Sequence, residues 1–345
     1  MVTLRKTMLV AIACWMVLLL LAGCGQGGAR DTREQTITIT DAAGRQVKVP
    51  YPAKRVVCLS SDAGEVICAL KGEKQVAAVS STLKRYPIVK ERFADTPEVG
   101  NFSQPNVEKI IEVRPDVVLG YASSIENKVA EKIEAAGIPF VVLPCNDMPT
   151  FVQDVHNLGR ILGKEENAQK FVAFIESNFK KITEVTGKIP ADKRPRVYVE
   201  GFSPLSTYGQ KSPSAQIIEL AGGKNIAASE AVPSPKVTSE WVIAQNPDVI
   251  VKVVTSDKTQ KDIMQKERDA LISRPGFSKI AAVKNGRVHV IGWKVYTGAR
   301  AVVGAAYLAR WLHPDQFADI DPEAIHRELM EKFYGTNLEG TWVYP

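Results

Sequence analysis

The side chains best suited to acid–base or metal chemistry are few in this 345-residue chain. The four histidines, His156, His289, His313 and His326, are far apart, three in or beside helix-like stretches and His289 between two valines. Catalysis needs a base near a nucleophile, and a zinc or manganese site needs histidines and carboxylates that converge on one ion. The sequence has no Gly-x-Ser-x-Gly elbow, phosphate loop or dinucleotide fingerprint. It therefore predicts a binding protein without catalytic residues, cofactor or metal site.

The cysteines divide by position. Cys24 follows an apolar stretch near the start of the chain, and only Cys58, Cys68 and Cys145 come after it. An odd number argues against a disulfide framework. Cys58 and Cys68 fall in strand-like and helix-like runs, which predicts buried apolar packing. Cys145 ends a strand-like run beside polar residues, so both a buried position and one facing a cleft stay open.

The first residues indicate export from the cytoplasm. Arg5 and Lys6 precede an apolar run over 8–21, and the sequence Leu-Ala-Gly-Cys then ends at Cys24. A run of 14 residues is shorter than the ~20 that a membrane span needs, so it predicts a signal peptide over 1–23. The tetrapeptide resembles the bacterial lipobox, which implies lipidation of Cys24 and an extracytoplasmic, membrane-anchored protein. The alternative is a cleaved, soluble protein with an incidental cysteine.

The mature chain is mildly basic. Removing 1–23 takes away two cations and no anions, so the net charge of +6 becomes 42 − 38 = +4. No run of Lys and Arg is long enough to suggest a nucleic-acid partner. Residues 24–35 begin with a glycine-rich stretch without apolar periodicity, which predicts a flexible tether.

Short β-branched runs alternate with amphipathic stretches from residue 55 onward. Continuous apolar strands separated by helices predict parallel sheets that are covered on both faces. We expect two Rossmann-like α/β lobes, 36–149 and 187–345, with mostly parallel central sheets. Apolar residues at steps of three and four over 150–186 predict one long helix that joins the lobes, and Gly163 indicates a break near its start.

The chain contains an internal repeat. Residues 106–118 align with 238–250 without gaps, and in both copies a glutamate, Glu108 or Glu240, precedes Pro-Asp by seven positions. Each copy predicts a helix that stops before a proline, followed directly by a buried strand. Any helix–Pro-Asp–strand unit would share this fold, but that likeness does not account for the matched glutamates.

Four segments in this order resemble the class III periplasmic-binding proteins, which serve siderophore, haem and cobalamin importers, over roughly residues 36–330. They are the opening 39–57, the stretch Val-Gly-Asn-Phe at 99–102, the stretch Glu-Leu-Ala-Gly-Gly-Lys-Asn-Ile at 219–226, and Gly-Ala-Arg at 298–300 leading into a helix. The resemblance implies a solute held in a shallow cleft between two lobes, at the carboxyl ends of the strands.

The resemblance implies a set of ligand-binding residues in the loops that follow these strands. Phe102 falls where cobalamin binders of the family carry a stacking tryptophan, although a core position is the alternative. Arg300 falls at an arginine found in many siderophore binders, although it could also be a surface charge. The full set is Ser60, Lys84, Arg85, Asn101, Phe102, Tyr121 and Asn146 from the first lobe, and Tyr208, Trp293, Tyr296 and Arg300 from the second.

The resemblance also implies partners. In the family, glutamates at the positions of Glu108 and Glu240 form salt bridges to a permease dimer that works with an ATPase. The alternative is that each glutamate only favours its helix N-terminus. For the solute, a metal chelate is the first expectation. A smaller anion such as molybdate and a free zinc or manganese ion stay open as solutes. As a role, a receptor that senses the solute and signals to a membrane partner also stays open.

Overall fold

The computed structural model describes residues 35–345 apart from residue 211 and the segments 256–258 and 338–339, and residues 36–345 form one unit. The predicted signal peptide, Cys24 and most of the predicted tether lie outside the described residues. Within the described part, no helix is long and apolar enough to cross a membrane.

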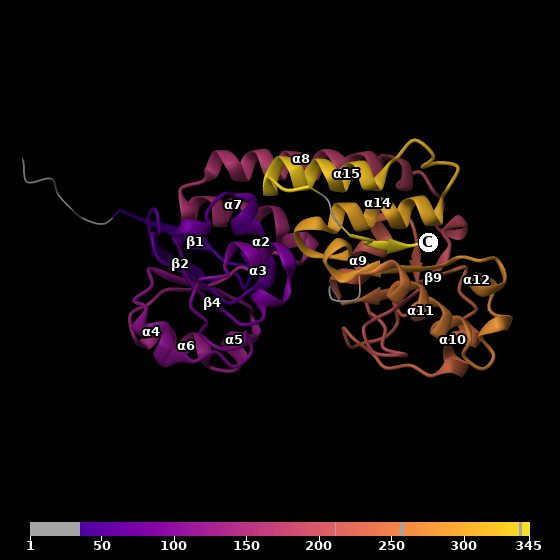
Figure 1. Ribbon diagram of the computed structural model, residues 1–345, viewed down its shortest axis with the longest axis horizontal. Helices are drawn as coiled ribbons and strands as arrows, with labels where there is room; N and C mark the ends of the chain where they lie inside the picture. Colours follow the sequence, from indigo (N-terminus) through magenta and orange to yellow (C-terminus); the bar gives the residue numbers. More distant parts are fainter. Residues whose placement is uncertain (1–34, 211, 256–258, 338–339) are drawn as a thin grey trace, which may run out of the picture. The chain divides into compact units, whose positions relative to one another are not determined.

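The first half of this unit is built on a four-stranded parallel sheet of order β4-β3-β5-β6 (Figure 1). β3, β5 and β6 are buried along their whole length, as expected for a parallel sheet covered on both faces. An antiparallel hairpin of β1 and β2 precedes the sheet. The strands are β1 Thr36–Thr40, β2 Gln46–Pro50, β3 Val56–Cys58, β4 Val76–Val79, β5 Val117–Gly120 and β6 Phe140–Val142. The helices are α2 Ser61–Ala69, η1 Glu73–Gln75, η2 Leu83–Arg85, α3 Pro87–Arg92, α4 Val107–Glu112, α5 Ser123–Glu126 and α6 Val129–Ala135.

The second half has a five-stranded sheet of order β11-β10-β9-β7-β8, parallel except for β11 at its edge. The α/β architecture with two mostly parallel sheets that was predicted from the sequence is confirmed. The strands are β7 Arg196–Glu200, β8 Lys224–Asn225, β9 Val249–Val254, β10 Val288–Gly292 and β11 Val343–Tyr344. The helices are η3 Ala191–Lys193, α9 Pro213–Leu220, α10 Ser239–Gln245, α11 Lys261–Ile272, η5 Phe277–Lys279, α12 Ala281–Lys284, α13 Trp293–Tyr296, η6 Gly298–Arg300, α14 Ala301–Leu312, α15 Pro322–Leu329 and η7 Met330–Tyr334.

The segment predicted as one helix over 150–186 consists of two helices, α7 Met148–Leu162 and α8 Glu165–Thr186. The break lies at Gly163, as the sequence indicated. This glycine ends α7 with a φ of +62°, a conformation that costs glycine little because it has no Cβ. The two helices pack closely, since a Cβ at Gly159 would lie 2.6 Å from that of Ala168. The connection to the second sheet is therefore α8 alone, 22 residues long.

A continuous apolar core joins the two halves. One cluster of buried side chains includes Val66 of α2, Phe171 and Ile175 of α8, and Val303 of α14. α8 packs against α14 and α9 of the second half as well as against α7. Figure 1 shows α8 above α14. The two sheets are thus connected by packed apolar side chains and not by the chain alone.

The internal repeat is visible in the contacts of its two copies. The side chains of Asn106 and Thr238 cap α4 and α10, each accepting a hydrogen bond from the backbone N–H three residues further on. The Pro-Asp carboxylates also act alike. Asp116 Oδ2 accepts from the backbone N–H of the residue before β3, and Asp248 Oδ2 accepts from that of the first residue of β7. The repeat therefore fixes each helix to the start of a neighbouring strand.

Candidate functional site

The carboxyl ends of the two sheets face each other and are joined by polar contacts. Lys294, two residues after β10, donates from Nζ to Asp62 Oδ1 near the start of α2 at 2.8 Å. The side-chain amide of Gln216 in α9 donates to Asp147 Oδ1 at 2.8 Å, and its oxygen accepts from the backbone N–H of Met148. The end of the sheets where ligands bind in open α/β folds is thus the face along which the two halves meet.

Two aromatic residues lie at the strand ends of the first half. Phe102 is 37% exposed and packs edge-on against Tyr121, with ring centroids 5.3 Å apart. Tyr121 directly follows β5, and its hydroxyl accepts from the backbone N–H of Ser61 at 3.2 Å. Burial raises the pKa of Tyr121, so its phenol stays neutral. The pair offers an apolar surface with a fixed orientation.

Three aromatic residues lie at the strand ends of the second half. Trp293 follows β10 and is stacked with Tyr208, with centroids 6.3 Å apart and planes inclined by 25°. Phe202, 47% exposed, packs edge-on against Trp293 at 5.3 Å. The sequence analysis did not select Phe202. A large aromatic residue between Gly201 and Ser203, directly after a predicted strand, is the signal that would have found it.

Near the same strand ends, two cations of the second half meet two carboxylates of the first. Besides its bond to Asp62, Lys294 Nζ lies 3.4 Å from Glu65 Oε2, and Arg300 Nε lies 2.7 Å from Glu65 Oε1. The Arg300–Glu65 approach is an ion pair without hydrogen-bond geometry, so these two atoms have no hydrogen-bond partner among the described residues. All four residues are buried. Burial opposes the charge on Lys294, but Asp62 and Glu65 outweigh it and raise the lysine pKa.

Aromatic rings and a histidine enclose the two cations. Lys294 Nζ lies 4.1 Å from the centroid of the Tyr86 ring, and the Arg300 guanidinium lies 4.9 Å from that of Trp342. Arg300 Nη1 is 3.4 Å from His326 Nε2. Burial, reinforced by the charge of Arg300, lowers the pKa of His326, so the imidazole is neutral. The structure therefore places Arg300 in a closed environment, and a ligand would have to displace Glu65 to reach it.

Ser60 and Tyr296, predicted to bind the ligand, are buried and hydrogen-bonded within the fold. The Ser60 hydroxyl donates to the Pro144 carbonyl and accepts from the backbone N–H of Ala63, which caps α2. The Tyr296 hydroxyl donates to the Ser214 carbonyl at 3.1 Å. These contacts hold the strand-end loops in place.

The remaining predicted residues lie nearer the surface. Lys84 pairs with Glu98 at 3.3 Å. Arg85 is exposed, and its guanidinium makes no ion pair or hydrogen bond with any described residue. The side-chain oxygen of Asn101 accepts hydrogen bonds from the backbone N–H groups two and three residues further on. These bonds shape the loop that carries the exposed ring of Phe102. Asn146 is half-buried after β6.

Glu108 and Glu240 occupy matching places, both exposed in the first turns of α4 and α10. The pKa of Glu240 is lowered by its own backbone N–H and by the Thr238 hydroxyl. Neither carboxylate forms an ion pair with a described residue. Both are therefore available at the surface.

The three cysteines after Cys24 are buried and free, which confirms the packing role predicted for Cys58 and Cys68. Cys145 is buried as well, so its thiol does not face solvent. Burial raises the pKa of Cys58 to about 12, which keeps the thiol protonated. Across the described residues, no group of three or more His, Cys, Asp or Glu side chains could hold a metal ion.

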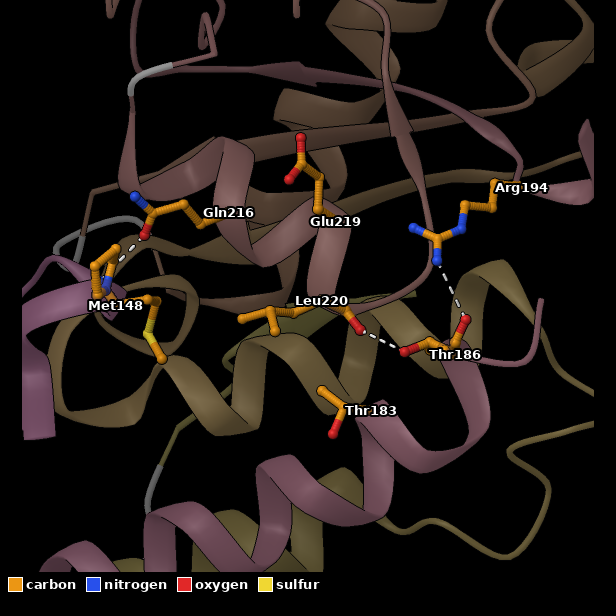
Figure 2. Close-up of a pocket in the computed structure, with 9 residues that line it drawn as sticks. Met148, Thr183, Thr186, Arg194, Gln216, Glu219 and Leu220 are labelled. Carbon is orange, nitrogen blue, oxygen red and sulfur yellow. Dashed lines mark hydrogen bonds between the residues drawn. The ribbon is translucent and has the colours of Figure 1, made fainter. Parts of the chain in front are cut away.

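A cavity of about 420 Å³ lies beside the connecting helices, and Figure 2 shows its lining residues. The start of α7, the end of α8 and α9 contribute to it. Gln216 bridges to the backbone of Met148 there, and Thr186 accepts a hydrogen bond from Arg194. None of the predicted ligand-binding residues lines this cavity. A second cavity of about 490 Å³, between β1 and α7, includes the buried Asp154 but none of them either.

These features agree with the comparison to known families. The model of the family described as periplasmic binding protein matches residues 56–294, more than half of the chain. The chain belongs to this family, whose members are the extracytoplasmic solute-binding proteins of ABC transporters and not enzymes.

Two relatives match over most of the chain, and a third matches over a little more than half of it. The ABC transporter substrate-binding lipoprotein YvrC of Bacillus subtilis is 29% identical over 326 residues, covering 88% of this chain and 98% of the relative. The molybdate-binding protein MolA of Haemophilus influenzae is 25% identical and covers 87% and 92%. A vitamin B12-binding protein of Vibrio campbellii is 27% identical over 58% of this chain and 70% of its own.

A solved structure shows the same fold. The TroA-like periplasmic binding protein FepB from Veillonella parvula superposes with a TM-score of 0.77 at 25% identity, covering 89% of this chain and 99% of that one. The membership in the class III type that the sequence motifs implied is confirmed.

Proposed function

We propose that this chain is a lipid-anchored solute-binding protein that captures a metal chelate, a ferric siderophore, haem or cobalamin, between its two lobes and delivers it to an ABC permease. The observation that carries the proposal is the pair of exposed rings, Phe102 and Phe202, at the strand ends of opposite lobes. Each ring is supported by a second aromatic residue. Such surfaces suit a large ligand with apolar faces, because aromatic side chains provide much contact area in few orientations.

The cations of the site support a chelate over a small oxyanion. A molybdate ion would need hydrogen-bond donors or cations free to approach it. Arg300 is buried against Glu65, the neighbouring Lys294 is buried against Asp62, and Lys84 pairs with Glu98. Among the described residues, Arg85 is the one predicted cation of the site whose guanidinium is exposed and unpaired. Molybdate stays the second candidate because the relative MolA is a molybdate-binding protein at 25% identity.

A thermal-shift series on the mature chain tests the proposal, with cyanocobalamin, haemin, a ferric siderophore and sodium molybdate as probes. A ligand that binds only the folded state stabilises it by about 2.7 kcal/mol at a concentration of 100 Kd. We expect one chelate to raise the melting temperature and molybdate to leave it unchanged. A shift with molybdate alone would establish the second candidate, and no shift with any chelate would contradict the proposal.

The anchor is tested separately. Lipidation of Cys24 predicts that the protein fractionates with membranes and that Cys24→Ala releases it into the soluble extracytoplasmic fraction. A wild-type protein that is fully soluble after export would favour the cleaved, unanchored alternative.

A further inference from the structure

The loop that carries Phe202 rests on a buried group of three charged residues, Glu200, Lys252 and Arg274. Glu200, the last residue of β7, is fully buried. Arg274, which follows α11, donates to both of its carboxylate oxygens, at 2.5 and 2.8 Å. Lys252, opposite Glu200 on β9, lies 3.2 Å from the carboxylate. We call these three residues the ion triad.

The ion triad holds the backbone of the loop on both sides of the exposed ring. Lys252 Nζ donates to the carbonyl oxygens of Gly201 at 2.5 Å and Phe202 at 3.2 Å. On the far side of the ring, the backbone N–H of Leu205 donates to Glu200 Oε2 at 2.9 Å. Leu205 itself has a φ of +62°, which a branched side chain rarely adopts. Hydrogen bonds to the ion triad thus keep the loop in a conformation that its sequence alone disfavours.

Buried ion pairs contribute little net free energy to the stability of a fold. Desolvation of an ion pair often cancels its attraction, and apolar residues of similar size are commonly as stabilising. Burial opposes ionisation of Glu200, but the hydrogen bonds from Arg274 and the charge of Lys252 outweigh it and lower the carboxyl pKa. What these charged groups provide, and apolar ones would not, is directional bonding to particular backbone atoms.

We propose that Glu200, Lys252 and Arg274 are positioning residues that hold the loop 201–206 so that Phe202 is presented to the solute in one orientation. The loop places the ring edge-on against Trp293 while 47% of Phe202 stays exposed. An exposed ring on a loose loop would lose conformational entropy on binding, whereas a fixed ring does not. The contact with the solute rests on the proposed function, but the fixation of the loop does not.

Hydrogen exchange on the ligand-free protein tests the fixation. We expect the Leu205 amide to be protected in the wild type, and Lys252→Met to raise its exchange rate at least tenfold. Lys224→Met is the matched control, because Lys224 is exposed on β8 of the same sheet. An unchanged rate in Lys252→Met would overturn the proposal. If that variant does not fold, the wild type decides, since a Leu205 amide that exchanges like an unstructured peptide overturns it too.

A double-mutant cycle tests whether the ion triad acts through the ring, with cyanocobalamin and haemin as probes. We expect Phe202→Ala and Lys252→Met each to weaken binding about tenfold, and the double variant to bind no more weakly than Phe202→Ala alone. Additive losses would mean that Lys252 acts elsewhere, which overturns the proposal. If the wild type binds neither probe, the choice of ligand is at fault, and the exchange experiment decides the role of the ion triad.

Discussion

At the scale of single residues, burial shifts the pKa of several groups of this protein, and for Asp154 the shift changes the protonation state at mildly acidic pH. Asp154 of α7 is only 1% exposed, and its Oδ2 accepts from the backbone N–H of Cys145 and from the Thr150 hydroxyl. Burial nevertheless dominates and raises the Asp154 pKa to about 7. Between about pH 4 and pH 7, the Asp154 carboxyl is therefore protonated in the folded protein and ionised in the unfolded chain.

This difference predicts the direction of a pH effect. Because the folded state binds the extra proton, the contribution of Asp154 to stability falls as the pH rises from about 4 to about 7. Asp154→Asn keeps an acceptor oxygen and removes the titration. In urea unfolding experiments, we expect the free energy of unfolding of the variant, relative to that of the wild type, to be about 1–3 kcal/mol higher at pH 8 than at pH 5. An equal response of both proteins to pH would contradict the assignment.

Arg300 shows how a partner decides the effect of a substitution. Arg300→Ala leaves the Glu65 carboxylate buried without its guanidinium, which typically costs about 3–5 kcal/mol. We therefore expect a clear fall in the melting temperature of the ligand-free protein. Phe102→Ala is the comparison, because the ring is 37% exposed and its loss should weaken solute binding with little change in melting temperature. An Arg300→Ala protein as stable as the wild type would show that the pair is not formed in solution.

At the scale of elements, the repeated unit of helix, Pro-Asp and strand places two carboxylates alike. Glu108 and Glu240 stand exposed in the first turns of α4 and α10, whose caps and strand contacts correspond. Two equivalent carboxylates suit a permease that is itself a two-fold dimer. The alternative, favourable interaction with the helix dipole, would concern the stability of each helix alone.

Changing both glutamates separates these roles. We expect the double variant Glu108→Arg/Glu240→Arg to retain its solute affinity and to lose uptake through the permease. Glu112→Arg is the matched control, since Glu112 is exposed on the same helix α4 and should transport normally. Undiminished uptake by the double variant would refute docking, and a loss of solute affinity would move the glutamates into the cleft.

At the scale of the whole folded unit, the connection between the two sheets is stiff. α8 extends over 22 residues and packs against elements of the second half. Asp62 and Lys294 form a buried ion pair between the halves, which separation would break and expose. We expect the radius of gyration from X-ray scattering to change by less than about 1 Å when a ligand binds. A larger fall would mean that the halves close as a hinge.

The local pattern of the sequence was sufficient for most helices and strands and for their order along the chain, but not for the two-residue strands β8 and β11. Short β-branched runs identified the parallel strands, Gly163 indicated the helix break, and the Pro-Asp repeat predicted two corresponding units, because each signal depends on neighbours within one helix or strand. The helical segment predicted over 150–186 divides at that glycine, whose φ of +62° ends α7, and α8 is the long helix that joins the two halves.

The state of the site depended on contacts between distant parts of the chain. Lys294 lies 232 positions from the carboxylate that it pairs with, and Phe202 is held by charges from β9 and the end of α11. Residue type and spacing give the charge of such a group but not its partner. The sequence by itself therefore predicted the two-lobed fold and the family of solute-binding proteins, and both are confirmed. Only the tertiary structure decided which cations are neutralised and which rings stay exposed, because both follow from packing between separate elements.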